Sequence, residues 1–194
     1  RGLPFCHWVA PQLGQLFPQL ADLSPGHLHR ALTVVRPTPI RIEADEVTYN
    51  LHIILRLEIE RALIGGEIET ADVPAVWREK ARELLGLDVP DQRRGPLQDI
   101  HWCMGAFGYF PTYTLGNLYA AMFWDAARRD LPDLDQQLAA GQCAPLLGWL
   151  RTRVHARGNL VTADALCREV TGQPLSADAF VAYLQRRYAA RDHT

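Results

Sequence analysis

Residues 95–113 read GPLQDIHWCMGAFGYFPTY, and this stretch carries too much chemistry for a simple connector. Its nineteen residues include a carboxylate, a histidine, a tryptophan, two tyrosines, two phenylalanines and three glycines, with a proline near each end. Glycines permit sharp turns and prolines stiffen the backbone, so the polar ends of His101, Tyr109 and Tyr113 can be held in fixed positions. Binding and catalytic loops are commonly built this way. A buried aromatic corner, in which each polar group only satisfies a neighbour, explains the same spacing equally well.

The composition is that of an ordinary globular protein with a substantial core. Of 194 residues, 48% are apolar and 22% are charged. A chain of this length buries roughly 70% of the surface of its unfolded state. Leucine and alanine are frequent, which favours helices. We therefore expect one all-α domain spanning residues 1–194.

Charge and cysteine usage exclude several classes of partner and site. The formal net charge is -2, and no basic face or polybasic segment predicts binding to nucleic acid or to anionic lipid. No apolar run approaches the roughly 20 residues that a membrane span requires. The four cysteines are scattered without a C-x-x-C pair, which favours reduced thiols in a cytoplasmic protein over a cysteine-based zinc site.

The longest helix is predicted from Glu43 to Ile64, with the glycine pair that follows as its stop signal. Polar residues recur along it at helical spacing: Asp45, Tyr49, His52, Arg56 and Glu60. This stripe is either a solvated face or the wall of a cleft. Tyrosine and histidine are unusual on a solvated face, and lysine is absent from the stripe, so we favour the cleft wall.

Capping and breaking residues define the other predicted helices. Ser24 caps a helix through about Val35, and a second helix begins at Asp72 or Pro74 and ends at Gly86. Thr114 caps a helix through about Asp130, and Thr162 caps a later one. Pro11 and Pro18 are expected to divide the first 23 residues into two short helices. A short extended segment is expected near Pro39 to Ile42.

Two groups of residues resemble a known family. The runs GPLQDIHW (95–102) and GAFGYFPTYTLGNLYAA (105–121) are similar to the late signature of the carboxypeptidase Taq family. Members are zinc-dependent metallocarboxypeptidases with an all-helical, cleft-containing fold. The run IRIEADEVTYNLH (40–52) resembles the family's I-R-x-x-A-D motif and the helix after it. With residues 150–188, the resemblance spans nearly the whole chain in the correct order.

The resemblance implies the C-terminal part of that fold. The family's H-E-x-x-H zinc helix, and the later H-E-S segment with the third metal ligand, would both precede residue 1, and neither motif occurs in these 194 residues. In the complete enzyme, zinc would polarise the scissile carbonyl while the H-E-x-x-H glutamate acts as general base. We expect no metal site and no cofactor in this chain itself.

What remains resembles the substrate side of such an active site. His101, Tyr109 and Tyr113 fit hydrogen-bond donors directed at the developing oxyanion. Tyr109 is the preferred partner of His101, and Tyr113 is the second choice.

Other polar residues complete this predicted substrate side. Arg41 is the best candidate for binding the terminal carboxylate of a peptide, because a guanidinium pairs with it through two hydrogen bonds. The family's D-x-R-x-T arginine is missing here, so the division of this role stays open. Asp45 is expected to fix the turn into the helix or to pair with an arginine. Asp99 is expected to orient the histidine or a nearby segment, Gln98 to hold the loop backbone, and His52 to line the cleft.

Two functions follow from these features. The first is the C-terminal part of a metallocarboxypeptidase acting on peptide C-termini, inactive alone and dependent on an N-terminal part from the same gene or another chain. The second is a stand-alone, metal-free relative that binds peptides or proteins. The chain opens without a start methionine, which suggests a cleavage product or an interrupted gene. With either function, the absence of the family's N-terminal part would uncover apolar surface that the complete fold buries, so we expect a dimer or larger assembly.

Overall fold

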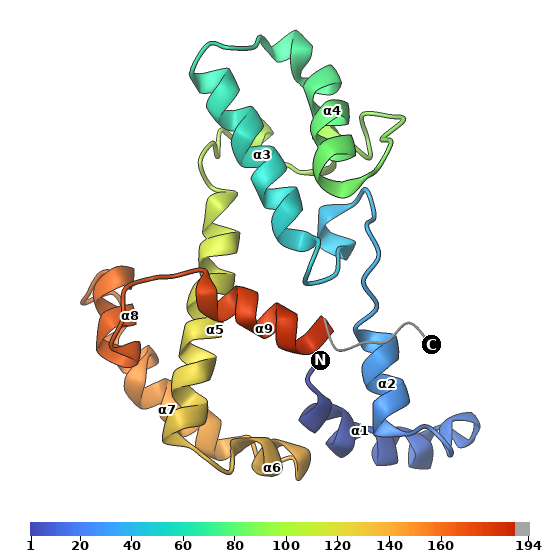
Figure 1. The fold of residues 1–194 in the computed structure, drawn as a ribbon, viewed down its shortest axis with the longest axis vertical. Helices are drawn as coiled ribbons and strands as arrows, with labels where there is room; N and C mark the ends of the chain where they lie inside the picture. The colour runs from blue at the N-terminus through green and yellow to red at the C-terminus, as the bar shows by residue number, and fades with distance from the viewer. Residues whose placement is uncertain (189–194) are drawn as a thin grey trace. The chain divides into compact units, whose positions relative to one another are not determined.

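The chain folds into helices joined by turns and by two longer loops, before α3 and before α5. A computed structural model describes residues 1–188, and within them the secondary structure is helical with no strand (Figure 1). The α-helices are α1 (Leu3–Leu16), α2 (Pro25–Leu32), α3 (Tyr49–Ile64), α4 (Val73–Leu85), α5 (Pro111–Asp130), α6 (Leu134–Ala139), α7 (Ala144–Arg153), α8 (Ala163–Thr171) and α9 (Asp178–Tyr188). The all-α prediction is confirmed. None of the helices within this range is long and apolar enough to cross a membrane.

Short 3-10 helices lie in several of the connections. They comprise Pro18–Leu20, Arg41–Glu43, Thr70–Asp72, Pro96–Gln98, Trp102–Met104 and His155–Arg157. The extended segment predicted near Pro39 to Ile42 is reduced to the extended backbone of Ile40, after which the chain turns into a 3-10 helix.

Two compact units divide the chain. One comprises Val35–Gly116, and the other comprises Arg1–Val34 together with the chain from Asn117 onward. Helix α5 belongs to both, because the boundary falls within it. A single domain for residues 1–194 stays a prediction. All the predicted site residues lie in the unit Val35–Gly116, which we call the central unit.

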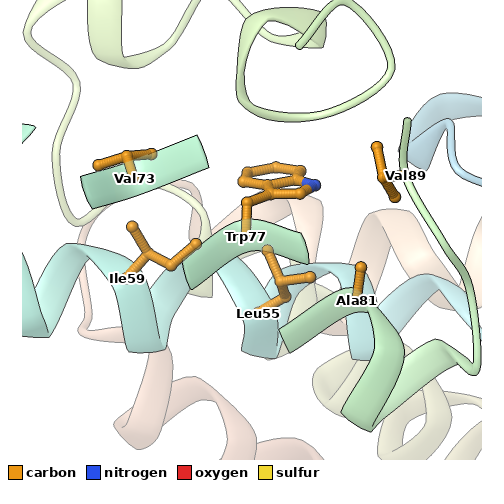
Figure 2. Packing of buried hydrophobic residues seen from close by; sticks show 6 residues of the cluster. All are labelled: Leu55, Ile59, Val73, Trp77, Ala81 and Val89. Atoms are coloured by element: carbon orange, nitrogen blue, oxygen red, sulfur yellow. The ribbon is translucent and has the colours of Figure 1, made fainter. Parts of the chain in front are cut away.

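The core of the central unit lies between α3 and α4, which pack side by side (Figure 1). Leu55 and Ile59 of α3 meet Val73, Trp77 and Ala81 of α4, and Val89 completes the cluster. Figure 2 shows the Trp77 indole in the middle of these side chains. This packing holds together α3 and α4, and α3 carries site residues.

The N-terminus of α3 differs from the predicted one. The helix begins at Tyr49 rather than Glu43, because Asp45 Oδ1 accepts hydrogen bonds from the backbone N–H groups of Val47 and Thr48, both at 2.9 Å. An aspartate that captures nearby N–H groups holds a turn instead of a helix. The prediction that Glu43 to Ile64 is the longest helix was therefore wrong: α5 is longer, with 20 residues against 16 in α3.

Proline had a smaller effect at the N-terminus than we expected. Helix α1 runs unbroken through Pro11, so the expected break at Pro11 was wrong, whereas α1 does end before Pro18, which opens a 3-10 helix. Pro11 removes only one hydrogen bond of the helix. Packing of α1 against α2 and α6 supports the helix across that gap.

Local helix signals were read correctly in several places. Ser24 Oγ accepts a hydrogen bond from His27 N at 3.2 Å, and Thr162 Oγ1 accepts one from Ala165 N at 3.2 Å, so both caps are confirmed. Helix α4 ends at Gly86, whose φ of 66° is in the left-handed region. Helix α2 ends at Leu32, earlier than the predicted Val35.

Candidate functional site

A buried carboxylate between two arginines forms the centre of the site. Asp99 Oδ1 accepts hydrogen bonds from Arg41 Nη2 at 2.6 Å and from Arg41 Nε at 3.1 Å. Its other oxygen, Oδ2, accepts one from Arg56 Nε at 2.8 Å and lies 2.6 Å from Arg56 Nη2. Asp99 therefore joins the turn before α3 to the middle of α3, over sequence separations of 58 and 43 residues. We call these three residues the Arg–Asp–Arg cluster.

The Arg–Asp–Arg cluster is shielded from water. The side chains of Arg41 and Asp99 are each 7% exposed, and that of Arg56 is fully buried. Burial raises the pKa of Asp99, but the two arginines outweigh burial and hold that pKa below its ordinary value. Burial lowers the pKa of Arg56 to about 10, with Asp99 opposing the shift. All three groups are thus charged at neutral pH, and the cluster carries one excess positive charge.

Gln98 and Tyr49 hold Arg41 in place. The backbone N–H of Arg41 donates to Gln98 Oε1 at 2.8 Å, and Arg41 Nη1 donates to Tyr49 OH at 2.9 Å. Gln98 Nε2 in turn donates to three backbone carbonyls, those of Pro39, Arg94 and Gly95. The predicted structural role of Gln98, holding the loop by its backbone, agrees with these contacts.

His52 lies inside the central unit and is 1% exposed. Burial, together with the positive charge of Arg56, lowers the pKa of His52 from 6.5 to about 4, against a hydrogen bond with the Thr38 backbone that raises it. The imidazole is therefore neutral at physiological pH. Its Nε2 has no hydrogen-bond partner in the structure. Arg56 and Glu60 on the same stripe are 0% and 3% exposed, so the stripe is not a solvated face.

His101 lies at the centre of an aromatic group. Its Nε2 is 3.0 Å from Tyr113 OH, and its ring centroid is 4.4 Å from that of Phe110 and 5.6 Å from that of Tyr109. The hydrogen-bond partner of His101 is thus Tyr113, whereas Tyr109, the partner expected first, contacts the ring without a hydrogen bond to it. Phe110 is buried and Tyr109 is 49% exposed, so the group runs from the core to the surface.

The turn that carries His101 is fixed by its backbone. The N–H groups of Met104 and Ala106 donate to the His101 carbonyl at 3.1 Å and 2.9 Å. Gly105 has a φ of 74°, which only glycine adopts without strain, and this lets the chain reverse direction after the 3-10 turn. Trp102 anchors the turn to α3 by donating from Nε1 to Glu60 Oε1 at 2.8 Å.

The predicted site residues do not form a single hydrogen-bonded network: His101 pairs with Tyr113, and a separate network surrounds Arg41. Arg41, Asp99, Gln98 and Tyr49 are connected by hydrogen bonds, as described above. Asp45 lies apart from them and fixes the turn into α3, as the structural alternative predicted.

Arg56 is the main residue of the site to which the sequence assigned no role beyond the polar stripe. Spacing placed it on the polar stripe, one turn after His52, yet nothing local indicated Asp99 as its partner. Its guanidinium also lies over the Trp77 ring, 4.6 Å from the centroid, and 5.2 Å from that of Phe110. These contacts join the Arg–Asp–Arg cluster to the aromatic group around His101.

The residues at hand do not fit a metal ion. Within residues 1–188 no three histidine, cysteine, aspartate or glutamate side chains come together in a way that could hold one. Asp99, the carboxylate two residues before His101, is fully engaged by arginines. The chemistry that this network itself supplies is hydrogen-bond donation and positive charge.

Comparison with known proteins identifies the family. The sequence-family model of the carboxypeptidase Taq (M32) metallopeptidases matches residues 1–188. The chain belongs to this family. Thermostable carboxypeptidase 1 of Thermus thermophilus is 47% identical to it over 190 residues, which are 98% of this chain and 37% of the relative.

Solved structures of carboxypeptidase Taq relatives share the fold. The M32 carboxypeptidase of Deinococcus radiodurans R1 superposes with a TM-score of 0.93 at 35% identity, covering 97% of this chain and 38% of that one. The structure of CHT gives a TM-score of 0.95 at 42% identity, covering 98% and 39%. The chain thus spans little more than a third of the length of these relatives.

Proposed function

We propose that this chain forms the substrate-facing part of a metallocarboxypeptidase that removes C-terminal residues from peptides. Membership of the carboxypeptidase Taq family supports the reaction class. The observation that carries the proposal is the hydrogen bond between His101 and Tyr113, whose ring centroid lies 5.1 Å from the Arg41 guanidinium of the buried cationic cluster. Such an arrangement combines donors for a carbonyl oxygen with positive charge for a carboxylate.

His101, Tyr113 and Tyr109 are the groups that would stabilise the developing oxyanion. Donors fixed before the reaction stabilise that charge because they need no reorganisation as it forms. The hydrogen bond to Tyr113 fixes the His101 ring, and packing on buried Phe110 limits its rotation. Tyr109 beside them is 49% exposed, which leaves this residue accessible to an incoming peptide.

Arg41 would attract the terminal carboxylate of the peptide by its positive charge more than by a pair of hydrogen bonds from its guanidinium. Its Nε and Nη2 already donate to Asp99, and its Nη1 donates to Tyr49. The Arg–Asp–Arg cluster still carries an excess positive charge, which buried surroundings screen less than water does. We therefore assign Arg41, supported by Asp99 and Gln98, to the carboxylate side of the substrate and His52 to the packing beneath it.

The chain alone would bind peptides without cleaving them. Among residues 1–188 no cluster fits a metal ion, so the metal, which in this family we expect to be zinc, would be held by a part of the enzyme outside this chain. A stand-alone peptide-binding module would share the same binding residues. The two functions differ in whether an added N-terminal part restores hydrolysis.

Apolar side chains around the site would meet that additional part or a second copy of the chain. Leu97, Ile100 and Met104 are 62%, 68% and 72% exposed, all within one short loop. Large exposed apolar patches mark interaction surfaces in soluble proteins. We expect association beyond the 21.8 kDa monomer at micromolar concentrations, measured by sedimentation velocity.

Peptide binding tests the proposal directly. Two N-acetylated tripeptides, one with a free C-terminal carboxylate and one with a C-terminal amide, are titrated into the chain, and the ring resonances of His101 and Tyr109 are followed by NMR. We expect the acid to shift these resonances at lower concentration than the amide, and neither peptide to be hydrolysed when zinc is added. Equal responses to the two peptides, or hydrolysis by the chain alone, would contradict the proposal.

A further inference from the structure

We propose that Arg56 of α3 is a positioning residue that fixes the location of the His101 ring. The proposal rests on the proposed function of His101 as a donor. Arg56 does not touch the surface where a peptide would bind, because its side chain is fully buried. It acts through two neighbours of His101, one along the backbone and one through ring packing.

The backbone connection runs through Asp99. Arg56 Nε and Nη2 both reach Asp99 Oδ2, at 2.8 Å and 2.6 Å. Asp99 is two residues before His101, and the backbone turn that follows is closed by hydrogen bonds to the His101 carbonyl. A fixed Asp99 therefore fixes the start of the turn from which the His101 side chain projects.

The ring connection runs through Phe110. The Arg56 guanidinium lies 5.2 Å from the Phe110 centroid, and the Phe110 ring lies 4.4 Å from that of His101. Phe110 is 1% exposed, so it has little freedom to move away. Arg56 thus supports the surface on which the imidazole packs.

The need to neutralise the charge of Asp99 does not explain why Arg56 is buried beside it. Arg41 already pairs with the same carboxylate through two hydrogen bonds, so a second arginine adds an excess buried charge. Burying an unmatched cation is unfavourable in itself. Arg56 also has two contacts besides Asp99 and Phe110: its Nη1 donates to the His52 carbonyl at 2.8 Å, and its guanidinium lies over the Trp77 ring. A side chain that contacts Asp99, His52, Trp77 and Phe110 is suited to fix the loop that carries His101 relative to α3.

The experiment compares three variants of the full chain by NMR of the histidine rings. Arg56→Met removes the fork and the charge but leaves the Arg41–Asp99 pair, while Arg56→Lys keeps the charge without the planar fork. Arg82→Met is the control, because it removes an arginine from an exposed ion pair with Asp88 in the same unit. His101 resonances are assigned with His101→Gln.

We expect Arg56→Met to move the His101 ring resonances toward those of an exposed histidine, as the ring loses its place over Phe110. The methyl resonances of Ile59 and Val73 should stay dispersed as in a folded α3–α4 core, although small shifts are expected because Arg56 packs on the neighbouring Trp77 ring. Arg56→Lys should give a smaller shift, and Arg82→Met none. These spectra need no catalysis, so they are independent of the role of His101. If the His101 ring moves in Arg56→Met but His101 proves to have no role in binding or catalysis, only the proposed function is refuted.

Unchanged His101 resonances in Arg56→Met would overturn the proposal, since the ring would then be positioned by Phe110 and Tyr113 without help. If Arg56→Met fails to fold, Arg56→Lys decides. Lysine retains the charge but lacks the planar fork, so a smaller shift of the His101 resonances is still expected. His101 resonances identical to the parent in that variant would overturn the proposal equally.

Discussion

Acidification should destabilise the central unit through its buried histidine. In the folded chain the pKa of His52 is lowered from 6.5 to about 4 by burial and by the nearby Arg56. Between these two pH values the unfolded chain binds a proton that the folded chain does not bind. The free energy of unfolding contributed by His52 is therefore present in full above pH 6.5 and falls as the pH is lowered toward 4.

The size of this loss follows from the pKa difference. One pKa unit corresponds to about 1.4 kcal/mol, so the difference between 6.5 and about 4 amounts to roughly 3 kcal/mol by pH 4. The carboxylate of Asp99 acts in a separate window. Its pKa is held below the ordinary 3.8, so the stability that it contributes is lost only as the pH falls below about 4. Between pH 7 and pH 4, His52 should dominate within this cluster.

Urea unfolding at pH 7, 5.5 and 4.5 provides the assay. The methyl resonances of Ile53 and Ile59 report on α3, because both side chains are buried in the central unit. The parent chain and a variant with exposed His7 changed to asparagine should lose stability alike as the pH falls. His52→Asn, which does not titrate, should show a loss smaller by roughly 2.5 kcal/mol at pH 4.5. Equal pH slopes for the parent and His52→Asn would refute this reasoning.

Three substitutions extend the test to other parts of the chain. Asp99→Asn should destabilise the central unit by about 3 to 5 kcal/mol, seen in its urea midpoint, because it leaves two arginines buried without a carboxylate. Gly141→Ala should destabilise the other unit by more than about 1 kcal/mol, because the glycine has a φ of 76° and an added Cβ would overlap the Trp8 indole. Ser24→Ala should cost about 1 kcal/mol and speed hydrogen exchange in the first turn of α2; unchanged exchange there would contradict the cap.

Several features set by neighbours in sequence were predictable, but the cap at Thr114 was wrong: α5 begins at Pro111, and Thr114 Oγ1 donates to Asn50 Oδ1 instead. The caps at Ser24 and Thr162 and the stop at Gly86 depend on a few adjacent residues, and the structure has all three. The stripe through His52 and Arg56 was also recognised as something other than a solvated surface, because its residue types do not suit water.

Features set by distant neighbours were not predictable. Arg56 and Asp99 are 43 residues apart, and no spacing rule connects a helix position to a loop at that distance. The choice between Tyr109 and Tyr113 as partner of His101 depended on where α5 begins. Because α5 starts at Pro111, Tyr113 lies in its first turn and its hydroxyl meets His101 Nε2.

The central claim is that His101 acts in catalysis only when the rest of the family fold is present. To test it, the matching stretch of Thermus thermophilus thermostable carboxypeptidase 1, 47% identical to this chain, is replaced by this chain, and carboxypeptidase activity is measured with zinc. We expect activity in this chimera and none in the isolated chain. His101→Gln should lower the turnover of the chimera by about 100-fold or more, whereas the exposed control His155→Gln should not. A folded chimera whose turnover is unchanged by His101→Gln would contradict the account.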